Sequence, residues 1–208
     1  MKVLSCEPLP LPGALLLRFA RFRDDRGYFT ETYRDGDLQR LPGLEGFVIR
    51  QVNESRSRAG VVRGLHFQWS PPMGKLVRTV EGHMVDLMLD VRVGSPTYGR
   101  AIAVDMPADP DAASDAWVWL PPGLAHGNVY LRDSAIEYLC TASWNPAGEA
   151  GVSPLAADID WSLCEGATLS LIRGVFERQP MLSDKDRAGP TLAQWRADPR
   201  SGELRWLG

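Results

Sequence analysis

The chain has 208 residues, of which 44% are hydrophobic and 24% are charged, and its formal net charge is −3. A chain of this length fits one domain, or one domain with an appendage, and can bury a sizeable core. The slight negative charge argues against a surface that coats nucleic acid, although it permits a local basic pocket for a phosphorylated small molecule. We therefore expect no nucleic-acid partner.

The cysteines and the N-terminal stretch indicate the cellular compartment in which the protein is expected. Cys6, Cys140 and Cys164 are widely spaced and form no CxxC pair, which is typical of reduced thiols rather than of a disulfide framework. Glu7 and three prolines interrupt the apolar run at the N-terminus, so no signal peptide is expected. No window approaches the ~18 apolar residues of a membrane helix. These features predict a soluble, cytoplasmic protein with no membrane partner.

Strand-like runs of β-branched and aromatic residues recur along most of the chain, and turn sequences rich in Gly, Pro and Asp separate them. The predicted strands cover residues 14–20, 28–33, 46–53, 61–69, 74–94, 100–106, 116–122, 127–131 and 135–144. Within the longest of them, residues 84–93 alternate between apolar and polar side chains. Many short strands with frequent turns favour a sandwich or barrel over a strand–helix repeat.

Helical candidates are few. Residues 36–41 predict a short helix, and residues 182–195 predict a late helical segment that Ser183 begins. We find no repeat, low-complexity segment or interdomain linker. The prediction is a single all-β domain over residues 1–208, with a barrel core at about 45–145 and a C-terminal tail with a short helical segment at about 165–208.

The predicted strand 61–69 reads VVRGLHFQW and carries Arg63 and His66 three positions apart, with Gly64 between them. A histidine in a half-buried strand either packs with a hydrogen bond or takes part in chemistry, and the local sequence leaves both open. His83 follows Gly82, which marks a turn or a close approach, and we interpret this histidine as structural.

His126 lies in PPGLAHGN, where a turn brings a histidine to the start of a strand. This pattern resembles the second motif of cupin barrels. The first cupin motif, an HxH followed by a glutamate, does not occur in the chain. The spacing of the histidines therefore gives no support to a metal site.

Several long motifs occur in a fixed order. They are FRDDRGYFTETY (22–33), QVNESRSRAGVVRGLHFQ (51–68), GKLVRTVEGHMVDLMLDVRVGSPTYG (74–99), LPPGLAHG (120–127) and EYLCT (137–141). Together they resemble the dTDP-4-dehydrorhamnose 3,5-epimerase family, from about Phe19 to the segment LSDKDR. The resemblance implies a cupin-like double-stranded β-helix (a jelly-roll sandwich or barrel) and a homodimer, without a metal or a redox cofactor.

The implied activity is epimerisation of a nucleotide-linked, dTDP-type 4-keto-6-deoxy sugar at C3, C5 or both, in deoxysugar biosynthesis. The C4 ketone acidifies the neighbouring C–H bonds, so the reaction needs a base on one face, an acid on the other and a donor near the enolate oxygen. His66 matches the family's base, Tyr138 its acid, and Lys75 the lysine near the C4 oxygen. An imidazole that titrates near neutrality suits reversible deprotonation of carbon.

The resemblance also implies residues that bind the substrate. An arginine can form charge-assisted bonds to a diphosphate, and an aromatic ring can stack on the base. Members of the family tend to use the RGYFTE stretch across the dimer interface. The implied substrate-binding residues are Arg63 and His126 beside the catalytic group, and Arg26, Phe29, Glu31, Gln51, Asn53, Trp144 and Glu149 around the nucleotide.

Two departures from the family pattern affect the site. The resemblance implies an aspartate before the sequence xIxW that hydrogen-bonds the catalytic histidine, and in GVSPLAADIDW this position is Ala156. We expect either that Asp158 substitutes through a small loop shift or that the pair is absent. AHGN also replaces the more usual AHGF. These departures favour a specialised relative that acts on a different 4-keto sugar nucleotide or inverts only one carbon. Two alternatives stay open: a cupin that moves the keto group between C3 and C4, and, because the aspartate is missing, a relative that binds a nucleotide sugar without converting it.

Overall fold

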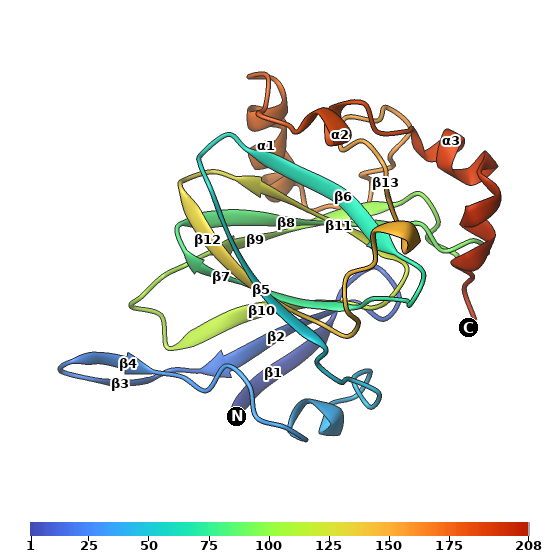
Figure 1. Ribbon diagram of the computed structural model, residues 1–208. Coiled ribbons are helices and arrows are strands. Elements are labelled where there is room, and N and C mark those ends of the chain that lie inside the picture. The colour runs from blue at the N-terminus through green and yellow to red at the C-terminus, as the bar shows by residue number, and fades with distance from the viewer. Residues whose placement is uncertain (208) are drawn as a thin grey trace.

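The computed structural model describes residues 1–207 and consists mainly of two antiparallel β-sheets that face each other as a sandwich (Figure 1). The six-stranded sheet has the order β1 (Val3–Pro8), β2 (Leu15–Ala20), β10 (Ser114–Leu120), β7 (Lys75–Glu81), β12 (Ser134–Cys140) and β5 (Gln51–Ser57). The five-stranded sheet has the order β13 (Glu149–Gly151), β6 (Val62–Gln68), β11 (Leu124–Tyr130), β8 (His83–Asp90) and β9 (Ala101–Pro107). The predicted sandwich of short strands is therefore confirmed.

Three α-helices follow the strands in the described part of the chain, namely α1 (Gly166–Phe176), α2 (Asp184–Arg187) and α3 (Leu192–Ala197). Short 3₁₀ turns occupy η1 (Leu38–Arg40), η2 (Pro146–Gly148) and η3 (Pro199–Glu203). The predicted helical segment 182–195 thus forms two helices, because Gly189 and Pro190 interrupt it. Ser183 begins the first, since its side chain accepts a hydrogen bond from the backbone N–H of Asp186.

The alternation of residues along β8 separates two cores. Met84 and Met88 belong to the core between the sheets, whereas Val85, Leu87 and Leu89 belong to a second core on the outer side of the five-stranded sheet. The helices cover that outer side (Figure 1), where Trp195 of α3 contacts Phe67 of β6 with ring centroids 4.7 Å apart. Strand β8 is therefore buried on both faces, and the polar side chains on it, Asp86 and Asp90, are fully buried.

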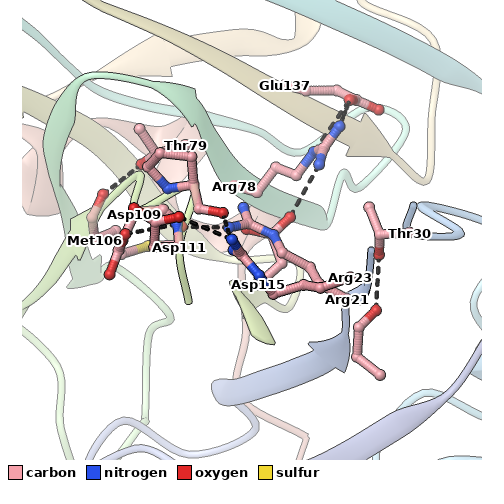
Figure 2. Close-up of polar contacts among 12 residues, drawn as sticks. Arg21, Arg23, Thr30, Arg78, Thr79, Met106, Asp109, Asp111, Asp115 and Glu137 are labelled. Atoms are coloured by element: carbon pink, nitrogen blue, oxygen red, sulfur yellow. Dashed lines mark hydrogen bonds and ion pairs between the residues drawn. The ribbon is translucent and has the colours of Figure 1, made fainter. Parts of the chain in front are cut away.

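A small hairpin, β3 (Phe22–Asp24) and β4 (Gly27–Phe29), projects from the sandwich beside the six-stranded sheet (Figure 1). A chain of ion pairs lies next to it (Figure 2): Arg21 contacts Asp115 at 3.0 Å, and Arg78 contacts Asp115 at 2.9 Å and Glu137 at 2.8 Å. Arg21 also stacks over the ring of Tyr28 on the hairpin. Asp115 therefore links the start of the hairpin to the central strands of the sheet.

We expect Asp115→Ala to destabilise the fold by about 3 kcal/mol, because it leaves the buried guanidinium group of Arg21 without a counter-ion and leaves Arg78 with Glu137 alone. Urea unfolding measures the change. Asp111→Ala is the matched control, since Asp111 also pairs with an arginine of this region, Arg23, at 2.8 Å but is exposed to solvent. The control should leave the unfolding midpoint nearly unchanged. Equal midpoints for the two variants would contradict the structural role given to Asp115.

Candidate active site

A bulge in β6 brings Arg63 and His66 to the same side of the sheet. In a regular strand, residues three positions apart point to opposite faces. Here β6 pairs with β11 as His66↔His126 and Arg63↔Asn128, so the three-residue step on β6 opposes a two-residue step on β11. The extra residue on β6 reverses the alternation. Both side chains therefore line one cavity.

Two glycines make this pairing possible. Gly64 has a φ of +107°, a conformation that residues with a side chain rarely adopt. A Cβ atom at Gly64 would lie 2.5 Å from the carbonyl oxygen of His126, and one at Gly127 would lie 2.7 Å from the carbonyl oxygen of Arg63. The two strands approach so closely here that neither position accepts a side chain without a shift. The glycine between Arg63 and His66 is thus part of the construction of the site.

The first cavity has a volume of 460 Å³ and lies between the sheets. The five-stranded sheet contributes His66 from β6 and His126 from β11, and the six-stranded sheet contributes Lys75 from β7 and Tyr138 from β12. His66 and Tyr138 therefore approach the cavity from opposite walls.

A second cavity of 290 Å³ shares residues with the first. His66, Lys75 and Tyr138 line both cavities. The remaining walls of the second one contain four of the residues implied as nucleotide-binding, namely Gln51, Asn53, Trp144 and Glu149. The three implied catalytic side chains thus lie where the two cavities meet.

His66 has a carboxylate partner, Asp186 of α2. The His66 Nε2 atom lies 2.6 Å from Asp186 Oδ1, and the other carboxylate oxygen accepts a hydrogen bond from the backbone N–H of Gly64 at 3.3 Å. Burial opposes the charge of Asp186, but the hydrogen bond and the charge of His66, with those from Ser183 and Gly64, outweigh it and lower the pKa of Asp186. A buried carboxylate with these partners stays ionised and holds the imidazole ring in one orientation.

The expectation that Ala156 or Asp158 decides the partner of His66 is wrong. Asp158 accepts hydrogen bonds from the backbone N–H groups of Leu192 and Ala193, at 3.1 and 2.8 Å, and so caps the first turn of α3. Ala156 packs at the edge of the core beneath the helices. The carboxylate that pairs with His66 comes instead from the segment LSDKDR. A missing carboxylate was the reason to consider a non-catalytic relative, and that reason therefore no longer holds.

His126 also has a carboxylate partner, but in a different environment. Its Nε2 atom lies 2.8 Å from Asp86 Oδ2, and both side chains are buried. Burial lowers the pKa of His126, although the charge of Asp86 opposes this shift. Burial therefore favours the neutral form of His126 in the cavity wall.

Burial also shifts the pKa values of Tyr138 and Lys75, the two titratable groups on the opposite sheet. It raises the pKa of Tyr138, so the phenol keeps its proton at neutral pH. It lowers the pKa of Lys75, and the charges of Cys140, Glu149 and Asp86 counteract this in part. Within residues 1–207 the Lys75 amine forms no hydrogen bond or ion pair, so its donors are free for a ligand in the cavity.

The nucleotide-side residues form a connected rim. Trp144 donates a hydrogen bond from its indole N–H to Glu149, and Lys185 of α2 forms an ion pair with the same carboxylate. Gln51 accepts a hydrogen bond from the backbone N–H of Trp144 at 2.8 Å and donates one to Asn53 at 2.9 Å. The Trp144 side chain remains exposed, so its ring is accessible to a base.

The hairpin residues Arg26, Phe29 and Glu31 do not join either cavity of this protomer. Phe29 is 64% exposed, and Arg26 pairs only with Asp24. Glu31 pairs with Arg34 and with the chain's N-terminus. The single chain therefore does not bring these three predicted substrate-binding residues into the site.

No cluster of three or more His, Cys, Asp or Glu side chains that could hold a metal occurs in residues 1–207. Over the same residues, no helix has the length and apolar character needed to cross a membrane.

Comparisons with known proteins identify the family to which the chain is similar. A family model described as dTDP-4-dehydrorhamnose 3,5-epimerase matches residues 8–194. A relative with this description from Mycobacterium tuberculosis is 38% identical over 209 residues, which cover 98% of this chain and 94% of the relative. Another from Neisseria gonorrhoeae is 38% identical over 187 residues, 88% of this chain, and this chain spans 51% of that relative's length.

A solved structure extends the likeness to the fold. The crystal structure of dTDP-6-deoxy-D-glucose-3,5-epimerase from Legionella pneumophila, in complex with dTDP-4-keto-L-rhamnose, has a TM-score of 0.81 and 29% identity. The similarity covers 98% of this chain and 99% of that one. These findings confirm the cupin-type β-sandwich and the isomerase class implied by the sequence motifs. The chain belongs to the dTDP-4-dehydrorhamnose 3,5-epimerase family.

Proposed function

We propose that the protein epimerises a dTDP-linked 4-keto-6-deoxy sugar at C3, C5 or both. His66 removes the proton next to the C4 ketone, with Asp186 orienting its ring and stabilising the imidazolium that forms. Tyr138 returns a proton to the opposite face of the resulting enolate. Lys75 donates a hydrogen bond to the enolate oxygen, whose negative charge grows in the transition state.

One observation carries the proposal: His66 and Tyr138 line the same cavity but belong to opposite sheets. Inversion of a carbon requires proton removal and delivery on opposite faces of the sugar. A base and an acid on two facing walls meet this requirement without movement of the sugar ring. The free amine of Lys75, on the same sheet as Tyr138, adds a donor for the oxygen between them.

The binding side of the proposal uses the second cavity. Trp144 stacks on the base, Glu149, Gln51 and Asn53 bind the nucleoside, and Arg63 and His126 contact the diphosphate end and the sugar. The exposed aromatic and basic residues of the hairpin, Phe29 and Arg26, with Glu31, complete the nucleotide site of a second copy in a homodimer. We further propose that this single-domain enzyme acts in the cytoplasm, where deoxysugar nucleotides are made.

Incubation with dTDP-4-keto-6-deoxyglucose in deuterated water tests the reaction class. Epimerisation predicts deuterium at C3 or C5 and a product of inverted configuration. A ketone that moves to C3 would instead identify an intramolecular oxidoreductase. Binding without exchange or conversion would identify a non-catalytic relative. NMR spectroscopy of the sugar separates these three outcomes in one sample.

Asp186→Asn should slow deuterium exchange by ~10²-fold, because an amide neither stabilises the imidazolium nor fixes the tautomer as a carboxylate does. Asp158→Asn is the matched control, since its amide oxygen can still cap α3, and it should leave exchange unchanged. Ala156→Asp should bring no gain. A large loss with Asp158→Asn and none with Asp186→Asn would contradict the assignment of the histidine's partner.

His66→Ala should bind dTDP with little change but lose exchange at the acidified carbon by ~10²-fold or more, the scale of losing a general base. Calorimetric titration with dTDP checks that the nucleotide site is intact. Exchange at the wild-type rate in this variant would remove His66 from the mechanism.

Tyr138→Phe should separate proton removal from proton delivery. The base on the five-stranded sheet remains, so exchange of the substrate proton should continue, while formation of the inverted product slows by ~10²-fold. Both rates are read from the same deuterium experiment by NMR. If exchange and inversion fall by the same factor, a residue other than Tyr138 supplies the second proton.

A further inference from the structure

Asn128 lies in the wall of the first cavity, and the proposed mechanism gives it no role. It lies on β11 two residues after His126, so both side chains point to the same face, and it lines the first cavity with His66, Lys75 and Tyr138. Its neighbours across the sheet are Asp86 on β8 and Arg63 on β6. Asn128 itself is only 4% exposed, so its amide must find its hydrogen-bond partners among these neighbours and the contents of the cavity.

The surroundings fix which end of the amide faces the cavity. Asn128 Nδ2 donates a hydrogen bond to Asp86 Oδ2 at 3.2 Å and lies 3.5 Å from the sulfur of Met84. A thioether sulfur accepts hydrogen bonds and cannot donate them, and Asp86 Oδ2 also serves as an acceptor here. The amino group therefore points toward them, and His126 Nε2, which bonds the same Asp86 oxygen, lies 3.3 Å from it. The carboxylate is fully buried, which makes the opposite orientation, with two acceptors facing each other, costly.

The amide oxygen of Asn128 is then left for the cavity. It forms no hydrogen bond within residues 1–207, and it is not one of the polar atoms there that are sealed from solvent without a partner. A carbonyl oxygen in this largely buried position needs a donor from the contents of the cavity. Substrate groups that can donate are hydroxyl and amino substituents of the sugar.

We propose that Asn128 is a specificity-determining residue that accepts a hydrogen bond from a hydroxyl or amino substituent of the sugar. The inference rests on the proposed function, and it narrows the substrate to 4-keto sugars with a donor at the position that faces β11. A phenylalanine, which the usual AHGF sequence would place here, offers no acceptor and favours an apolar substituent. Asn128 thus selects the sugar and leaves proton transfer to His66 and Tyr138.

The test uses pairs of dTDP-4-keto hexoses that differ by a single hydroxyl at C2, C3 or C6. The wild-type protein should prefer the hydroxyl-bearing member of one pair by ~10-fold or more in kcat/KM, because a site built to bond a hydroxyl rejects the analogue that lacks it. Asn128→Leu, which keeps the side-chain size, should reduce that preference to near unity. Titration with dTDP checks that the variant's nucleotide site is intact.

Dissociation constants for the same pairs, measured with the wild-type protein, give a reading that does not depend on turnover or on the variant's folding. A pair preference in binding without any deuterium exchange would refute the proposed reaction while supporting the role of Asn128. A wild-type protein that separates no pair by more than ~3-fold would overturn the inference, since a single desolvated hydrogen bond exceeds this factor. If Asn128→Leu keeps the wild-type preference and lowers kcat/KM equally for both substrates of the pair, Asn128 has only a structural role.

Discussion

The bulge between Arg63 and His66 is the constraint on which the site depends. Regular alternation would direct one of these side chains into the cavity and the other to the far side of the sheet. The bulge places both in the cavity, opposite His126 and Asn128 on the neighbouring strand. It requires a positive φ at Gly64 and close contact with Gly127. Two glycines therefore determine where these four side chains lie.

The two-sheet architecture sets the protonation states of the side chains that line the cavity. A single sheet offers one wall, but a sandwich offers two facing walls with a space between them. Burial in that space keeps the Tyr138 phenol protonated and favours the neutral forms of His126 and Lys75. Asp186 is the exception, since its hydrogen bonds overcome burial and keep it charged beside His66. The charged Asp186 thus lies beside His66 on one wall, and the protonated Tyr138 lies on the other.

The sequence motifs predicted the sandwich and most residues that the cavities bring together, because strands of period two and long ordered motifs are local signals. They failed for the partner of His66. Asp186 lies 120 positions along the chain from that histidine, and Ser183 before it indicated only a helix start. The direction of the Asp186 side chain depends on tertiary pairing: Met181 exchanges backbone hydrogen bonds with Gly60 and Val62, and this docks α2 against β6. No local pattern encodes such docking.

Other features depended in the same way on tertiary structure. The alternation along β8 does not reveal that its apolar residues face the helices while Asp86 faces the space between the sheets, so Asp86 could not be recognised as a buried partner of His126. Helix α1 begins at Gly166 and contains Gly174, residues of low helix propensity. It forms because Ile172 packs into the core outside the five-stranded sheet. The bulge itself was visible only as a glycine within a strand-like run.

The distribution of deuterium at low conversion tests most directly whether the base and the acid stand on opposite walls. The wild-type protein acts on a dTDP-linked 4-keto-6-deoxy sugar in deuterated water, and the remaining substrate and the inverted product are analysed separately by NMR. Delivery from the wall opposite the base predicts product that carries a solvent deuteron at the inverted carbon, while the remaining substrate stays largely unlabelled. Product that retains its original proton at that carbon would show removal and return by one group, and it would contradict the two-wall account.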